Sequence, residues 1–79
     1  MLYDINNANY IEDFKIKITF ENGKEGIVDL KEYPKRGGIF ASLADLNIFK
    51  QVKVNPEIGT ICWPNGADIA PETLYKKIK

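Results

Sequence analysis

Apolar and polar residues alternate most regularly between residues 14 and 20. The apolar positions of this run are Phe14, Ile16, Ile18 and Phe20. A period of two places them on one face of a β-strand and the intervening Lys and Thr side chains on the other. Asn22 and Gly23 follow, and this pair supplies the positive φ angles of a tight hairpin turn. The pattern predicts a returning strand over residues 26–30 that turns Val28 and Leu30 inward.

The N-terminal residues give a weaker pattern. Residues 2–5 are short, apolar and partly alternating, which predicts a strand. The stretch 6–9 contains three asparagines, and Asn-rich stretches are typical of turns and loops. We therefore expect the first strand to end before Asn6.

The middle of the chain is predicted to be a connection followed by a short helix. Pro34 and the glycines at 37 and 38 argue against regular structure over residues 31–38. Phe40 and Leu43 are then expected to reach the core. Asp45 is placed to cap a helix over residues 46–50, which would bury its apolar members, Leu46 and Phe49.

The last third predicts two more strands and a helix. Val52 and Val54 flank a lysine in one strand, residues 55–59 make a turn, and residues 60–63 form the last strand with Ile61 and Trp63 on one face. Pro64 stops that strand because it cannot donate to a sheet ladder. A helix is predicted from Pro71, with Leu74 and Ile78 on its buried face.

These elements together predict the fold class. We expect an α+β fold in which a small, mostly antiparallel sheet of four to five strands carries a short middle helix and a C-terminal helix packed on it. The chain has 79 residues and is 44% hydrophobic, which suits one small folded domain over residues 1–79.

Charge and residue usage restrict the function. Eleven basic residues balance eleven acidic ones, which argues against nucleic acid as the partner, because phosphate binding usually needs an excess of Lys and Arg. No apolar run approaches the ~20 residues of a membrane span, and the N-terminus has no signal-peptide pattern. With a single cysteine, Cys62, the chain cannot form an internal disulfide, and we expect a cytoplasmic protein with no membrane partner.

The residue types of the sequence do not favour nucleophilic catalysis. The chain has no histidine, so neither Ser42, its only serine, nor Cys62 has the usual base. Carboxylate or lysine chemistry stays open, without any spacing that favours it. We expect a protein that is not an enzyme and has no cofactor.

The segment 61–75 carries a resemblance to a known family. It reads Ile-Cys-Trp-Pro-Asn-Gly-Ala-Asp-Ile-Ala-Pro-Glu over residues 61–72, followed by Leu74 and Tyr75. This block resembles the end of the bacterial family catalogued as domain of unknown function 2442. Upstream, residues 20–23, 28–30 and the apolar positions at 40, 43 and 49 are also similar, so the likeness runs nearly end to end.

The resemblance implies a small α+β fold of strands and a C-terminal helix. Some similar domains are joined to a helix-turn-helix module, which is absent from this sequence. Members are often encoded beside another small protein of unknown function, which implies a toxin–antitoxin or related two-protein system. The family provides no catalytic residues that could be carried over.

The same segment supplies the candidate site. One interpretation is that Trp63, Asn65, Asp68, Glu72 and Tyr75 form a surface for a partner or small ligand, since Trp is enriched in binding hot spots. In the structural alternative, which the residue types favour, each residue serves the fold. Pro64 then ends a strand, Asn65 turns the chain, and Asp68 accepts backbone N–H groups near the helix start.

Three weaker candidates complete the set. Asp68 and Glu72 could share a helix face and hold a metal ion, although the usual His and Cys ligands are missing or single. The basic loop 35–38 could hold an anion, and the lysines at 76, 77 and 79 could touch phosphates. Each has a simpler interpretation as a solvated loop or helix end.

Three functions are consistent with the sequence. The leading hypothesis is a protein-interaction module, the antitoxin-like or regulatory partner of a neighbouring small protein. The alternatives are a nucleic-acid-binding accessory and a small-ligand binder that uses residues 63–72. A small sheet also exposes edge strands, so a homodimer formed by edge-strand pairing is a further prediction.

Overall fold

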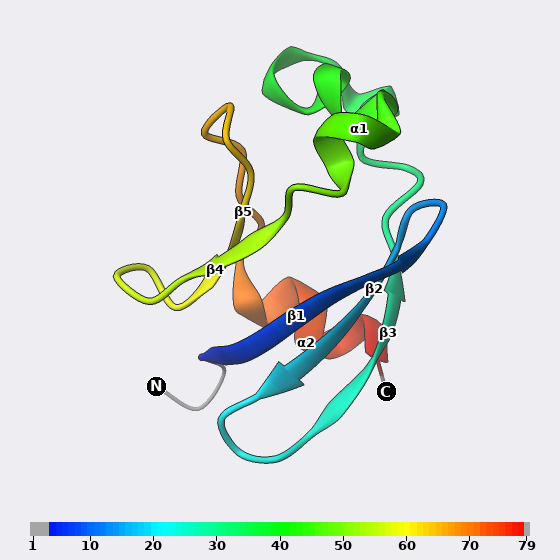
Figure 1. Cartoon of the computed structure of the whole chain (residues 1–79). Helices are drawn as coiled ribbons and strands as arrows, with labels where there is room; N and C mark the ends of the chain where they lie inside the picture. Colours follow the sequence, from blue (N-terminus) through cyan, green and yellow to red (C-terminus); the bar gives the residue numbers. More distant parts are fainter. Residues whose placement is uncertain (1–3, 79) are drawn as a thin grey trace.

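A computed structural model describes residues 4–78 of the chain. Five strands are present: β1 (Ile5–Glu12), β2 (Lys15–Phe20), β3 (Glu25–Asp29), β4 (Lys53–Asn55) and β5 (Thr60–Cys62). The helical elements are two 3₁₀ segments, η1 (Pro34–Arg36) and η2 (Gly38–Ala44), and two α-helices, α1 (Leu46–Phe49) and α2 (Pro71–Ile78). The predicted α+β class, with a short middle helix and a C-terminal helix, is confirmed (Figure 1).

The hairpin of β2 and β3 is confirmed as predicted. The strands pair antiparallel without a register shift, with Ile16 opposite Val28 and Ile18 opposite Gly26. Gly23 in the connecting turn has φ of 92°, a conformation that glycine adopts without a Cβ penalty. Ile16, Ile18, Phe20, Val28 and Leu30 are all buried, so the period of two identified the core face of this hairpin.

The expectation that the first strand ends before Asn6 was wrong. β1 runs from Ile5 to Glu12 and pairs antiparallel with β2, with Asn7 opposite Thr19 and Asn9 opposite Lys17. The two asparagines therefore lie on the solvated face of the sheet, where their polar side chains stay hydrated. Pairing with β2 outweighs their local preference for turns. Residues 2 and 3 of the predicted N-terminal strand lie outside the described residues.

The strands divide between two sheets. β1, β2 and β3 form one antiparallel sheet in that order, and β4 and β5 form a separate hairpin. β4 packs beside β1, and the N–H of Ile5 donates to the carbonyl of Gly59 at the turn of the second hairpin (3.0 Å). Figure 1 shows this hairpin extending away from the first sheet beside the start of β1.

The connection between β3 and β4 is more regular than predicted. Pro34 opens η1, because its fixed φ and missing N–H suit the first turn of a helix, and the glycine pair leads into η2. Tyr33 just before η1 is buried and packs edge-to-face on Phe40 (centroids 5.3 Å apart). Asp45 caps α1 as predicted, with its carboxylate accepting from the N–H of Asn47 (2.9 Å).

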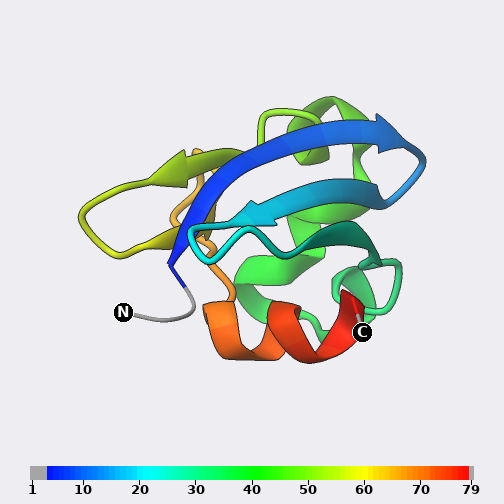
Figure 2. The ribbon, with the colours of Figure 1, turned by 90° about the horizontal axis from the view of Figure 1, so that it is seen from below.

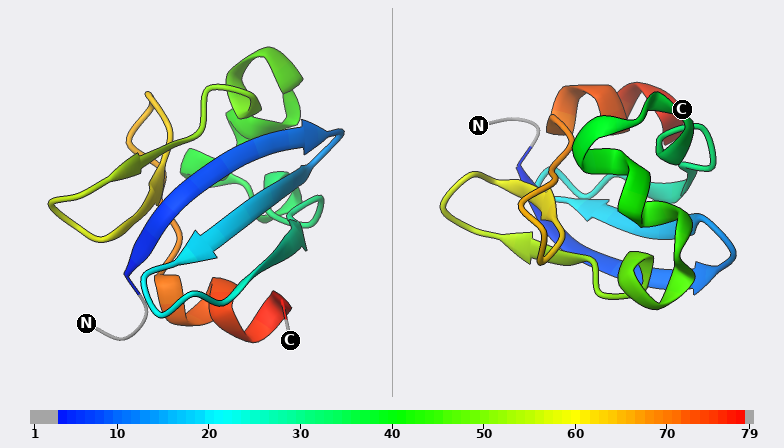
Figure 3. Two further views of the ribbon diagram at one scale, coloured as in Figure 1. Left: turned by 60° about the horizontal axis from the view of Figure 1, so that its bottom comes forward. Right: turned by 90° about the horizontal axis from the view of Figure 1, so that it is seen from above.

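One face of the first sheet is covered by helical elements and the other is open (Figures 2 and 3). Phe49 of α1 is fully buried and meets the rings of Tyr10 and Phe14. Leu74 of α2 is also fully buried. α2 packs on β3, where a Cβ added to Gly26 would lie 2.9 Å from the Cβ of Ile78. Glycine at this position lets the helix approach the strand.

Candidate functional site

Trp63 is part of the core. Its side chain is 2% exposed, and its indole N–H donates to the backbone carbonyl of Phe49 (3.0 Å). The ring also lies against the Phe49 ring, with centroids 5.7 Å apart. Because a partner cannot reach a side chain this deeply buried, the prediction of Trp63 as a surface contact is corrected: Trp63 joins the last strand to α1.

Asn65 links the turn after β5 to η2 through side-chain hydrogen bonds. Its side-chain oxygen accepts from the N–H of Ala67 (3.0 Å), and its amide nitrogen donates to the carbonyl of Ile39 (2.9 Å) and to Ser42 (3.2 Å). Gly66 completes the turn with φ of 93°. Both ends of the Asn65 side chain therefore serve the fold, although the residue lies at the surface.

Tyr75 joins α2 to the first hairpin. Its ring packs edge-to-face on Phe20 (centroids 4.9 Å apart), and its hydroxyl accepts from the side chain of Asn22 (3.2 Å). The ammonium group of Lys24 lies 5.0 Å from the ring centroid, close enough for a cation–π contact. Tyr75 is half-buried beside the β2–β3 turn, so its ring serves mainly to pack α2 against the first hairpin.

Asp68 and Glu72 are exposed, as Asn65 is. Within residues 4–78 neither side chain makes a hydrogen bond or an ion pair, so Asp68 does not accept from the start of α2 as the structural alternative expected. Asp68 instead forms an isolated backbone bridge with Cys62. No group of three or more potential metal ligands exists in the described part of the chain.

The predicted surface is therefore not one site. Trp63 and Tyr75 are packed, Asn65 is engaged in the turn, and Asp68 and Glu72 project from exposed positions on either side of the start of α2. Thr60 adds to the structural role of this region, because its hydroxyl donates to the carbonyl of Ile69. The segment holds the second hairpin, η2 and α2 together.

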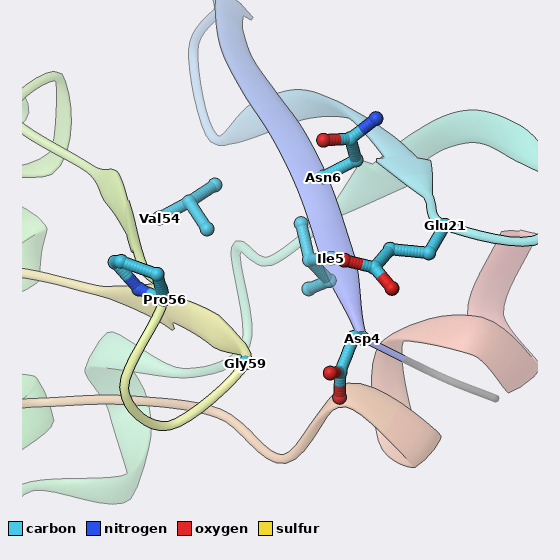
Figure 4. Close-up of a pocket in the computed structure, with 7 residues that line it drawn as sticks. All are labelled: Asp4, Ile5, Asn6, Glu21, Val54, Pro56 and Gly59. Carbon is cyan, nitrogen blue, oxygen red and sulfur yellow. The ribbon is translucent and has the colours of Figure 1, made fainter. Parts of the chain in front are cut away.

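Two shallow hollows lie elsewhere. One, of about 320 Å³, is bounded by the start of β1 and the β4–β5 hairpin, and carries the carboxylates of Asp4 and Glu21 (Figure 4). Asp4 also lies close to Gly59, where an added Cβ would stand 2.7 Å from its carboxylate oxygen. The other, of about 500 Å³, is lined by Phe14, three lysines and two aspartates. Neither of these two hollows includes a residue of the segment 63–72.

The two basic segments meet at Tyr33. The guanidinium of Arg36 lies 4.2 Å from the ring centroid of Tyr33, and the ammonium of Lys77 lies 5.9 Å from it. The ring thus brings a cation of the 35–38 loop and a cation of α2 to one place. Two cations on a chain of zero net charge make a weak surface for a phosphate backbone.

The open face of the first sheet is a candidate binding surface that was not predicted from the sequence. Its side chains are exposed or half-buried and come from all three strands: Asn7, Asn9, Glu12, Lys15, Lys17, Thr19, Glu25, Ile27 and Asp29. Ile27 is 54% exposed, the most exposed large apolar side chain of those described. The period of two in β3 could have found it, because an inward Val28 places Ile27 outward.

β3 is also the open edge of this sheet. The N–H of Phe20 donates to the carbonyl of Lys24 (2.8 Å), and the N–H of Leu30 donates to that of Phe14 (2.9 Å). Since hydrogen-bonding direction alternates along an antiparallel strand, Glu25, Ile27 and Asp29 direct their backbone groups away from β2. No backbone bond from another described element reaches these three residues.

The other edge strand, β1, is protected. Its pairing with β2 has two register shifts, between Ile5 and Asn7 and between Tyr10 and Glu12, and such bulges turn an edge away from intermolecular pairing. β4 also packs beside it. β3 pairs with β2 without a register shift, and α2 packs on it at Gly26, a residue whose backbone bonds to β2; the outward backbone groups of Glu25, Ile27 and Asp29 can therefore accept another strand.

These elements define the chain as a small α+β domain: an antiparallel three-stranded sheet with helices on one face, joined to a second hairpin. The chain belongs to the DUF2442 family, described as proteins of unknown function, whose family model matches residues 5–79. Neither the curated proteins nor the solved structures contain a significant match. None of the helices described within residues 4–78 has the length and apolar character that a membrane crossing requires.

Proposed function

We propose that this chain is a protein-interaction module, the antitoxin-like or regulatory partner of another small protein. The observation that carries the proposal is the open β3 edge with the exposed Ile27 beside it. An unpaired edge is a template for another strand, and proteins that keep one exposed commonly use it for recognition.

The composition supports a binding role without catalysis. The chain has no histidine, and its single cysteine, Cys62, is buried at the end of β5. The proposal places the protein in the cytoplasm, where a free thiol remains reduced. A bacterial two-protein system suits a domain of this size, because the partner contributes part of the binding surface that one small domain cannot form alone.

Capture from the native host tests the proposed role. The tagged chain, expressed at its native level, is expected to retain one small protein, and the two purified proteins should form a complex of equal stoichiometry by light scattering after gel filtration. Growth arrest caused by the partner alone, and relieved by this chain, would identify an antitoxin. A chain that elutes alone and forms no complex with the product of any neighbouring gene would contradict the proposal.

A further inference from the structure

We propose that the β3 edge binds an extended segment of a partner protein in which basic, apolar and basic residues occupy alternate positions. The inference deepens the proposed function, on which it rests, by stating the chemistry of the partner. It follows from the residues of β3 whose backbone groups face outward from the edge and whose side chains lie on the open face beside it.

The backbone of β3 sets the register of such a strand. Glu25, Ile27 and Asp29 have free backbone donors and acceptors, and their side chains all lie on the open face of the sheet. In an antiparallel pair, residues that exchange two hydrogen bonds stand directly opposite each other with their side chains on one face. Three partner side chains therefore meet these three residues individually.

The side chains of β3 set the composition of the strand. Two carboxylates flank one apolar group at alternate positions, so basic residues opposite Glu25 and Asp29 and an apolar residue opposite Ile27 match the edge. Cross-strand pairs of opposite charge stabilise a sheet and like charges destabilise it. The pattern reads the same in both directions, but only an antiparallel partner places each of its residues directly opposite one of these three with two hydrogen bonds, so the proposed strand is antiparallel.

The lysines of β2 do not cancel the preference of the β3 edge for a strand with basic residues. Lys17 lies 3.6 Å from Glu25, but both side chains are about half exposed, and the ion pair is weak because solvent screens it. Lys15 stands opposite Asp29 in the register. The carboxylates occupy the edge strand and the lysines the central strand, so an incoming chain meets the acidic groups first.

The same charges disfavour a second copy of this chain at the edge. The antiparallel register that pairs all five residues of β3 with those of a second β3 is centred on Ile27, and it places Glu25 opposite Asp29 twice. A shift by two residues would place Glu25 opposite Lys31 and remove both repulsions, but this register needs the N–H of Lys31, which is already engaged by the Asp29 carboxylate (3.0 Å). The edge is thus better suited to a basic partner strand than to homodimer formation.

Peptides of defined pattern test the inference on the intact chain. The first probe is acetyl-Thr-Thr-Lys-Thr-Val-Thr-Lys-Thr-Thr-amide, the second has Glu in place of both Lys, and the third is the first peptide N-methylated at Val. Each is titrated into ¹⁵N-labelled protein while the amide resonances are followed. The N-methyl group removes a single donor that faces Ile27 and leaves charge and length unchanged.

We expect the basic peptide to shift the amide resonances of Glu25, Ile27 and Asp29 and to bind at least about tenfold more tightly than the acidic peptide. N-methylation should abolish these shifts. The double variant Glu25→Lys/Asp29→Lys, whose changes lie on an exposed face, should reverse the preference between the two charged peptides. Its spectrum outside β3 should match that of the unmodified protein, which shows that the fold is retained.

Several results would overturn the inference: equal binding of the two charged peptides, shifts centred on Ile39 or Ile58 instead of β3, or no shift at about 5 mM peptide. A concentration-dependent dimer that Ile27→Lys dissociates would also overturn it, because the edge would then accept its own acidic sequence. The experiment needs no native partner. The two proposals can therefore fail separately. If only the proposed function is wrong, the basic peptide binds the β3 edge and capture from the native host yields no partner. If only the edge is wrong, capture yields a partner and the peptide does not bind.

Discussion

Replacement of Trp63 by Ala is expected to lower the free energy of unfolding by about 3–5 kcal/mol, the usual cost of removing a large aromatic side chain from a core. Trp63 is 2% exposed, lies against Phe49 and donates to its carbonyl, so the substitution leaves a cavity and removes one of the two hydrogen bonds to that carbonyl, which also accepts from the N–H of Val52 (3.2 Å). A domain of 79 residues has a total stability of about 4–12 kcal/mol. Urea denaturation followed by circular dichroism measures the loss.

Two further variants separate the causes of this effect. Trp63→Phe keeps an aromatic ring but removes the indole donor, while the carbonyl of Phe49 still accepts from the N–H of Val52 (3.2 Å), so we expect a loss of about 0.5–1.5 kcal/mol for the hydrogen bond. Ile58→Ala, at a position 48% exposed, should change stability by less than about 0.5 kcal/mol. A Trp63→Ala protein as stable as the parent would show that the indole does not hold α1 and the last strand together.

Leu74→Ala is expected to release α2 and to cost about 2–5 kcal/mol. α2 has only eight residues, too few for an isolated helix to be stable in water, so tertiary contacts must hold it in place. Leu74 is its only fully buried side chain among those described, and Tyr75 and Ile78 are half-buried. Thermal and urea unfolding of the variant, with hydrogen exchange of the α2 amides, measure both the lost stability and the released helix.

Thr73→Ala provides the matched control, because it changes the neighbouring exposed position of the same helix. It should preserve or slightly raise stability, since Ala is the better helix former. Equal losses for Leu74→Ala and Thr73→Ala would contradict a packing role for Leu74, because the effect would then follow helix propensity instead of contact with the sheet.

The sequence predicted those parts of the fold that depend on local pattern. The alternation in β2, the Asn–Gly turn and the Asp45 cap each involve residues close in sequence, and each is confirmed. The prediction for the asparagines of β1 was wrong because their strand state is determined by a partner strand further along the chain. The division of the strands into two sheets was likewise invisible, since it depends on how β4 packs beside β1.

The candidate site was predicted less well, for a related reason. The segment 61–72 is distinctive in sequence, and distinctive residues can serve the fold as well as a ligand. Trp63 and Asn65 bond to α1 and η2, elements that lie 14 to 26 residues earlier in the chain, and such contacts cannot be read from spacing. Ile27 drew no attention because a single isoleucine in a strand is ordinary until its exposure is known.

Recognition through the β3 edge is tested most directly by comparing Ile27→Lys with Ile58→Lys in binding the native partner by calorimetry. Both side chains are exposed, 54% and 48%, so both variants should fold, and both substitutions add the same charge. We expect Ile27→Lys to weaken the complex at least about tenfold, while Ile58→Lys changes its affinity less than about twofold. Equal affinities for the two variants would show that the partner binds away from the β3 edge.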